Sequence, residues 1–103
     1  MYKVLYLPVA TFDLTEVNDY LYEFSISAAE NFLDSLEQFA KRIADFPKLY
    51  PPYERDLFFR KAVLGDFLLF YSVDDARLHI IIHRIFHHSR DIDHHLKSTR
   101  KNF

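Results

Sequence analysis

The chain has 103 residues, of which 13 are Lys or Arg and 15 are Asp or Glu, and it contains one Gly, four Pro and no Cys. This length predicts a single domain over residues 1–103, stabilised by one core because no disulfide can form. The lack of Cys excludes thiol catalysis and cysteine-ligated zinc, and it favours a cytoplasmic location, where thiols stay reduced. We expect neither export nor membrane insertion, because a signal-peptide pattern and a membrane-length apolar run are both missing.

Charge is distributed unevenly along the chain. Residues 1–54 hold four basic and nine acidic residues, whereas residues 55–103 hold nine basic and six acidic residues and all six His. The net charge of −2 disfavours a protein that coats nucleic acid through a strongly basic surface. Any anion-binding or acid–base surface is therefore expected in the C-terminal half, although two differently solvated faces would give the same pattern.

The N-terminal segment predicts a strand followed by a helix. Residues 2–7 are aromatic or branched with one exception and stop at Pro8, as a strand does. Apolar residues then recur at helical spacing over residues 10–24. Asp13 and Glu16 are expected in the first turn of this helix, where they would cap it or interact with its dipole.

A second helix is predicted directly after the first. Ser27 and Glu30 form a Ser-x-x-Glu capping box at its start. Apolar residues follow at helical spacing as far as Phe46, and Pro47 forbids continuation. The break over residues 23–27 is so short that the two helices must fold back on each other as an antiparallel hairpin.

The C-terminal half predicts a three-stranded antiparallel meander. Residues 47–56 hold three of the four prolines and are expected to form an extended connection. Short turn-forming links separate three runs of strand-like sequence, residues 57–64, 67–73 and 77–86. The middle run is apolar at nearly every position, so both of its faces should be covered. Residues from 90 onward predict a short helix and a basic tail.

Together these elements predict an α+β fold in the order β-α-α-β-β-β with a short C-terminal helix. The helical hairpin packs on one face of a twisted, mostly antiparallel, four-stranded sheet. Several short motifs lie along this framework. They are Asp13-Leu14, Tyr20-Leu21, Phe46-Pro47-Lys48-Leu49, Arg60 before the Gly65 turn and a strand ending in Tyr71, and the segment from His83 to Ile92. In this order and spacing, they resemble the RelE/ParE superfamily of toxins from type II toxin–antitoxin modules.

The resemblance is closer to ParE, because RelE-type ribonucleases usually carry an Arg where this chain has Leu68 and are usually strongly basic. It implies a cytoplasmic toxin that inhibits growth, serves plasmid stabilisation and is neutralised by a cognate antitoxin. DNA gyrase is the implied target of a ParE-like toxin, and ribosome-bound mRNA that of a RelE-like one. A degenerate member that only binds its antitoxin is a third reading.

Two sets of side chains are candidates for function. Cleavage of RNA needs a base, an acid and cations near the phosphate, and the candidates for a ribonuclease are His87, His88, Arg60 and Arg90. The candidates for partner or target binding are Lys61, Tyr71, Arg84, Tyr50 and Tyr53. Three of these also have a structural reading. Tyr50 and Tyr53 would serve equally as lids over the core, and Tyr71 suits a core position in its apolar strand.

Arg84 has two readings as well. It alternates with Leu78, Ile80 and Ile82, which places it on the face that the helices cover, and a buried arginine there would need a charged partner.

Neither a cofactor nor a metal site is expected. His79, His83 and His87 share one face of their strand, but at about 3.3 Å per residue each lies roughly 13 Å from the next, too far to share one ion. His87 or His88 could still meet His94 or His95 across a turn, so a metal site of that kind stays open.

Overall fold

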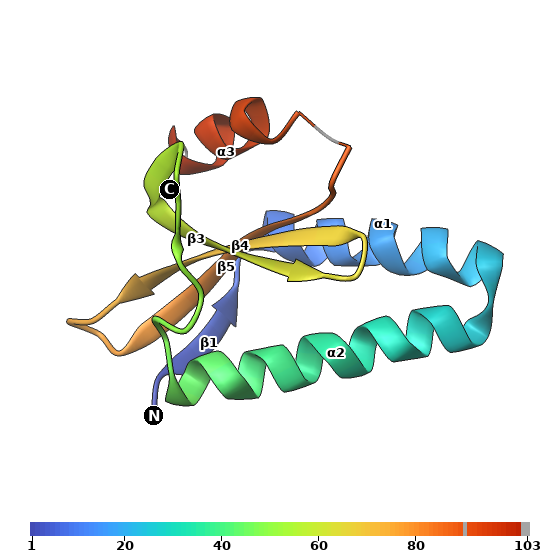
Figure 1. Ribbon diagram of the computed structural model, residues 1–103, viewed down its shortest axis with the longest axis horizontal. Helices are drawn as coiled ribbons and strands as arrows, with labels where there is room; N and C mark the ends of the chain where they lie inside the picture. The colour runs from blue at the N-terminus through green and yellow to red at the C-terminus, as the bar shows by residue number, and fades with distance from the viewer. Residues whose placement is uncertain (90, 102–103) are drawn as a thin grey trace.

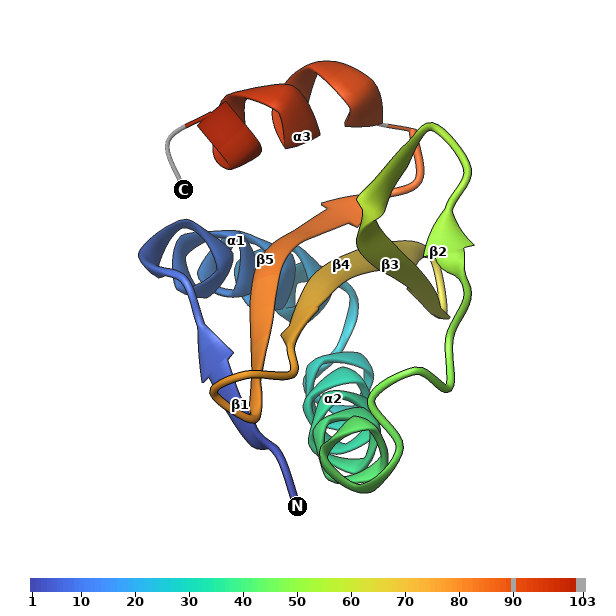
Figure 2. The ribbon, with the colours of Figure 1, turned by 90° about the vertical axis from the view of Figure 1, so that its left-hand side faces the viewer.

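A mixed sheet with two helices on one face and a third helix on the other forms the fold (Figures 1 and 2). This computed structural model describes residues 1–89 and 91–101. The elements are β1 (Lys3–Tyr6), α1 (Pro8–Phe24), α2 (Ile26–Asp45), β2 (Pro52–Tyr53), β3 (Asp56–Leu64), β4 (Phe67–Asp74), β5 (His79–His87) and α3 (Ile92–Lys101). The predicted α+β class, the helical hairpin and the meander are all confirmed.

Over the described residues, the sheet has five strands in the order β1-β5-β4-β3-β2, one strand more than predicted. The additional strand is β2, two residues at the sheet edge, where Pro52 is tolerated because an edge strand has unpaired positions. Strands β3, β4 and β5 pair antiparallel, whereas β1 runs parallel to β5 with Lys3 opposite His79. Strand β4 lies in the middle and is buried from Phe67 to Ser72, as its apolar sequence predicts.

Both helices begin earlier than predicted. Pro8 is the first residue of α1, because its fixed φ suits a helix start and its missing N–H needs no partner there. Asp13 therefore lies beyond the first turn and does not cap the helix. The cap of α2 is Ser25 rather than Ser27. Its backbone is extended, and its hydroxyl accepts a hydrogen bond from the Ala28 N–H at 3.0 Å.

The cap assignment predicts different effects for two neighbouring serines. Ser25→Ala is expected to lower the free energy of unfolding by about 1 kcal/mol, because the Ala28 N–H loses its acceptor. Ser27→Ala, inside α2, is the matched control and should stay within about 0.5 kcal/mol of the wild type, since alanine favours helix. Urea unfolding followed by circular dichroism measures both. A larger loss for Ser27→Ala would show that the cap lies there instead.

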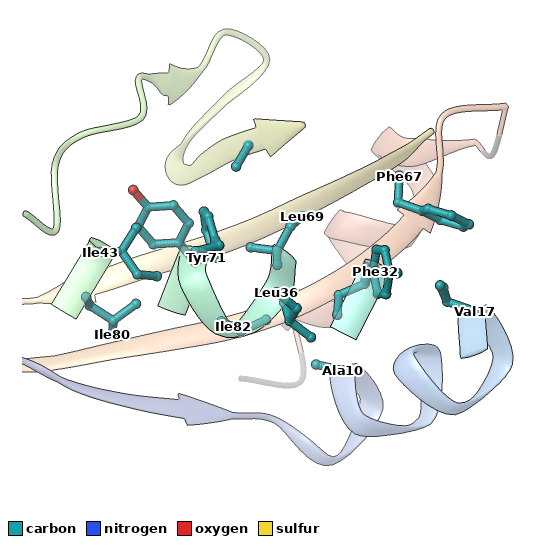
Figure 3. Packing of buried hydrophobic residues seen from close by; sticks show 13 residues of the cluster. Ala10, Val17, Phe32, Leu36, Ile43, Phe67, Leu69, Tyr71, Ile80 and Ile82 are labelled. Atoms are coloured by element: carbon teal, nitrogen blue, oxygen red, sulfur yellow. The ribbon is translucent and has the colours of Figure 1, made fainter. Parts of the chain in front are cut away.

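The main core fills the space between the helical hairpin and the sheet (Figure 3). Helix α2 contributes a stripe of buried side chains at helical spacing, Phe32, Leu36, Phe39 and Ile43. The stripe faces side chains of β4 and β5, among them Leu69, Tyr71, Ile80 and Ile82. A second, smaller core lies on the opposite face, where α3 places Leu96 against Phe59, Leu68, Phe70 and Phe86. Both faces of the sheet centre are therefore covered.

A β-bulge interrupts the pairing of β4 with β5. Tyr71 lies opposite Ile82 but its neighbour Phe70 lies opposite Arg84, so His83 is the extra residue. The bulge reverses the alternation of side chains along β5. Ile82 and Ile85 consequently both join the main core, although they are three residues apart. Strict alternation put Arg84 on the same face as Ile82, and that expectation is wrong because the bulge intervenes.

Candidate functional site

A groove of about 370 Å³ runs between α1 and the C-terminal part of β5. Strand β1 pairs with β5 only as far as Ile82, whereas β5 continues to His87. Beyond Ile82, the Asp13 side chain on α1 supplies an acceptor that a neighbouring strand would otherwise provide. It accepts a hydrogen bond from the Ile85 N–H at 3.0 Å. The residues that line the groove are Asp13, Glu16, Val17, Tyr20, Phe67, Arg84, Ile85, Phe86, His87 and Ser89.

A buried ion pair between Asp13 and Arg84 forms one end of the groove. The Asp13 carboxylate accepts hydrogen bonds from Arg84 Nε at 2.7 Å and from Nη2 at 3.0 Å, and only 7% and 13% of the two side chains are exposed. Arg84 Nη1 also donates to the Thr99 hydroxyl at 3.3 Å, and its guanidinium lies 4.5 Å from the centre of the Phe86 ring. The pair therefore joins α1, β5 and α3. It also supplies the partner that a buried Arg84 was expected to need.

Aromatic rings form the other end of the groove. The Phe67 ring lies edge-on to the rings of Tyr20 and His87, at centroid distances of 6.4 and 5.7 Å. His87 Nδ1 accepts the Ser89 N–H at 3.3 Å and lies 2.8 Å from the Ser89 hydroxyl oxygen. A neutral His87 therefore carries its proton on Nε2. This end offers a partly exposed, mainly aromatic surface beside the last residues of β5, which β1 does not pair.

The structure separates the candidates for RNA cleavage. Arg60 lies opposite Tyr71 and donates from Nη1 to the Tyr50 carbonyl at 2.7 Å, whereas His87 lies opposite Phe67. These two positions on β4 are four residues apart, roughly 13 Å along the strand. His88 is exposed and its ring lies 4.3 Å from that of His87. Arg90 lies outside the described residues.

The candidates for partner binding fall on both faces of the sheet. Tyr71 is fully buried, its hydroxyl donates to the Pro47 carbonyl at 2.8 Å, and burial raises its pKa. Tyr50 packs against the Phe39 ring in the main core. Tyr53 borders the smaller core on the other face, where the Lys61 ammonium lies 5.5 Å from the centre of its ring. Tyr53 and Lys61 are thus the two candidates that share one partly exposed site.

A partly exposed carboxylate ties α3 to the edge of the sheet. Asp93 accepts hydrogen bonds from Arg55 Nη1 at 2.7 Å and from the Tyr53 hydroxyl at 2.8 Å, and the arginine bond chiefly lowers its pKa. Asp93 was not among the predicted site residues, because nothing in the local sequence distinguishes it from other surface acids. Among the described residues, no group of three His, Asp or Glu is arranged to hold a metal ion. Likewise, no helix in the described part of the chain is long and apolar enough to span a membrane.

A family model described as the ParE toxin of type II toxin–antitoxin system, parDE, matches residues 4–92. The chain belongs to the ParE toxin family. It is therefore a toxin of the type II toxin–antitoxin class, and the resemblance to the RelE/ParE superfamily is confirmed. No curated protein sequence was found to match the chain.

Two solved structures share the fold. One is the RelBE2 toxin–antitoxin complex from Mycobacterium tuberculosis, with a TM-score of 0.64, 24% identity, and coverage of 84% of this chain and 96% of that chain. The other is the isolated RelE toxin of E. coli, with a TM-score of 0.64, 11% identity and full coverage of both chains. At these identities, the two matches establish a common fold, and they do not assign a chemical role to any residue of this chain.

Proposed function

We propose that this ParE-family toxin inhibits DNA gyrase by binding to it in the cytoplasm, and that a cognate antitoxin neutralises it. The observation that carries the proposal is the family match over residues 4–92. The arrangement of cations supports a binding mechanism rather than RNA cleavage. Arg84 is neutralised by Asp13, and Arg60 donates to a backbone carbonyl far along the sheet from His87.

The charge of the helical hairpin also disfavours an RNA substrate. Residues 8–40, the hairpin up to the last turns of α2, contain seven acidic residues and no Lys or Arg, and Lys41 and Arg42 follow near the end of α2. Proteins that bind RNA or DNA backbones gain most of their affinity from cations that neutralise phosphates. A hairpin of this composition repels a phosphate backbone, so the proposed target surface is that of a protein.

The groove between α1 and β5 is the proposed seat of an antitoxin segment. A peptide segment there would lie beside the last residues of β5, which β1 does not pair, and place apolar side chains against Tyr20 and Phe67. Tyr53 and Lys61 offer a second contact point on the α3 face. An antitoxin that wraps around the toxin would reach both sites, because a segment disordered alone can follow a large surface.

Gyrase supercoiling and ribosome-dependent cleavage of mRNA, measured with the same purified chain, test the proposal. We expect inhibition of supercoiling, intact message and slowed growth when the chain is induced without its antitoxin. Heat-unfolded chain serves as the control for nonspecific inhibition. Cleaved message with unaffected gyrase would overturn the proposal in favour of a RelE-like ribonuclease. A chain that leaves growth unchanged would instead indicate a member that only binds an antitoxin.

A further inference from the structure

The α1–α2 hairpin extends past the sheet and ends in a tip, residues 18–28 (Figure 1). In α1, the last buried residue is Val17, and in α2 the first is Ala29. Within residues 18–28, all of which the structure describes, no side chain is buried. Leu21 packs against the main core, but the core does not explain the exposed side chains of Tyr22, Phe24 and Ile26.

Both helix ends at the tip are capped in spite of its exposure. One residue, Ser25, ends α1 through its backbone N–H and caps α2 through its hydroxyl. On the last turn of α1, the rings of Tyr20 and Phe24 meet edge-on with their centroids 5.1 Å apart. Because the backbone at the tip is already held by these caps, binding would require little further backbone ordering, so the tip is suited to a contact.

Large apolar side chains dominate the surface of the tip. The exposed fractions are 69% for Phe24 and 64% for Ile26, and 46% and 48% for Tyr20 and Tyr22. Exposed apolar groups gathered in one place typically mark an interaction site in a soluble protein. Aromatic residues on a protruding surface suit insertion into an apolar pocket of a partner.

The charges around these side chains have one sign. Asp19 and Glu23 lie within the tip, Glu30 and Asp34 follow on α2, and all four residues are exposed. The first basic residue after Lys3 is Lys41, near the far end of α2. The complement of such a surface is an apolar pocket bordered by Lys and Arg, and attraction between the two would speed the encounter.

We propose that the tip is the surface with which this toxin docks on its target, a protein whose nucleic-acid-binding face is cationic. The inference rests on the proposed function, since a gyrase must neutralise DNA phosphates with Lys and Arg and therefore presents such a face. Tyr20 belongs both to the tip and to the groove beside β5. An antitoxin segment in the groove would thus cover part of the docking surface, which gives neutralisation a steric cause.

Two paired substitutions test the tip, one for its apolar side chains and one for its charge. The first tip variant combines Phe24→Ser with Ile26→Ser. Its control combines Phe46→Ser with Leu49→Ser, at the other end of α2, where the two side chains are 65% and 51% exposed. Asp19→Lys with Glu23→Lys is matched by Glu37→Lys with Asp45→Lys. Each matched pair makes the same kind of change on an exposed surface away from the tip. Thermal unfolding verifies that every variant is folded.

Affinity for purified gyrase holoenzyme is the first measurement. Both tip pairs should weaken binding at least about tenfold and both control pairs less than about twofold, which corresponds to losing a central contact. Raising NaCl from about 0.05 to about 0.5 M should weaken binding of the wild type but hardly affect the charge-reversed tip pair. Tip pairs that bind gyrase as the wild type does would overturn the inference and leave the proposed function intact.

Growth arrest after induction separates failure of the inference from failure of the proposed target. If the wild type arrests growth without binding gyrase, the gyrase assignment fails, and the tip is then judged by whether its variants alone lose the arrest. Equal arrest by all variants would overturn the inference. A wild type that neither binds gyrase nor slows growth overturns both proposals. Sedimentation shows whether the tip instead joins two copies of the chain, and a tip-dependent dimer with unchanged gyrase binding would also overturn the docking role.

Discussion

Asp13→Ala is expected to lower the free energy of unfolding by about 3–5 kcal/mol, the cost of leaving a buried charge without its partner. The Asp13 carboxylate accepts three hydrogen bonds, two from the Arg84 guanidinium and one from the Ile85 N–H. Only 13% of the Arg84 side chain is exposed, so little water can reach the guanidinium to replace the lost carboxylate. Urea unfolding of the purified chain measures the change.

Two further variants decide whether the loss arises from the buried pair. Asp19→Ala removes an exposed carboxylate from the same helix and should change the stability by less than about 0.5 kcal/mol. Asp13→Leu combined with Arg84→Met replaces both partners with apolar groups and should recover much of the loss, because no isolated charge remains. A small effect of Asp13→Ala, below about 1 kcal/mol, would show that water reaches Arg84 and that the pair does not hold α1 on β5.

The parts of the fold that were predictable are those with a strong local pattern. The continuous stripe of α2 and the apolar run of β4 each have one arrangement that buries their side chains, and both formed as expected. The starts of the helices were missed because Pro8 and Ser25 each serve two elements. Pro8 ends the strand and begins α1, and Ser25 ends α1 and caps α2. Strand β2 was missed because prolines indicate an irregular connection as well as an edge strand.

The site depended on pairings that no local pattern contains. The requirement of Arg84 for a partner followed from its expected burial, but Asp13 lies 71 residues away and had a local explanation as a helix cap. The groove exists because β1 stops at Tyr6 while β5 continues to His87, and this difference depends on the register between strands. The bulge at His83 was equally invisible, since Ile80 and Ile82 satisfy strict alternation and the shift appears only opposite β4.

Acidification from pH 6.5 to about pH 4 is expected to lower the free energy of unfolding through His83 by about 3 kcal/mol in total. The His83 side chain is fully buried at the bulge, with Nε2 2.8 Å from the Ser72 hydroxyl oxygen and the rings of Phe58 and Phe59 edge-on to it. Burial disfavours the imidazolium and lowers the pKa of His83 from 6.5 to about 4. The folded chain therefore stays neutral at this position over a range in which the unfolded chain binds a proton, so stability falls with the pH.

His83→Gln isolates this contribution, because an amide can keep the hydrogen bond to Ser72 but cannot titrate. The variant should lose less stability than the wild type between pH 6.5 and 4, while His88→Gln, at an exposed site, should follow the wild type. Hydrogen bonds from Tyr2 and from Arg55 lower the pKa of Asp75 and Asp93 below 3.8, so their stabilisation disappears only at lower pH. Equal pH dependence of the wild type and His83→Gln would show that the imidazole takes up its proton in the folded chain.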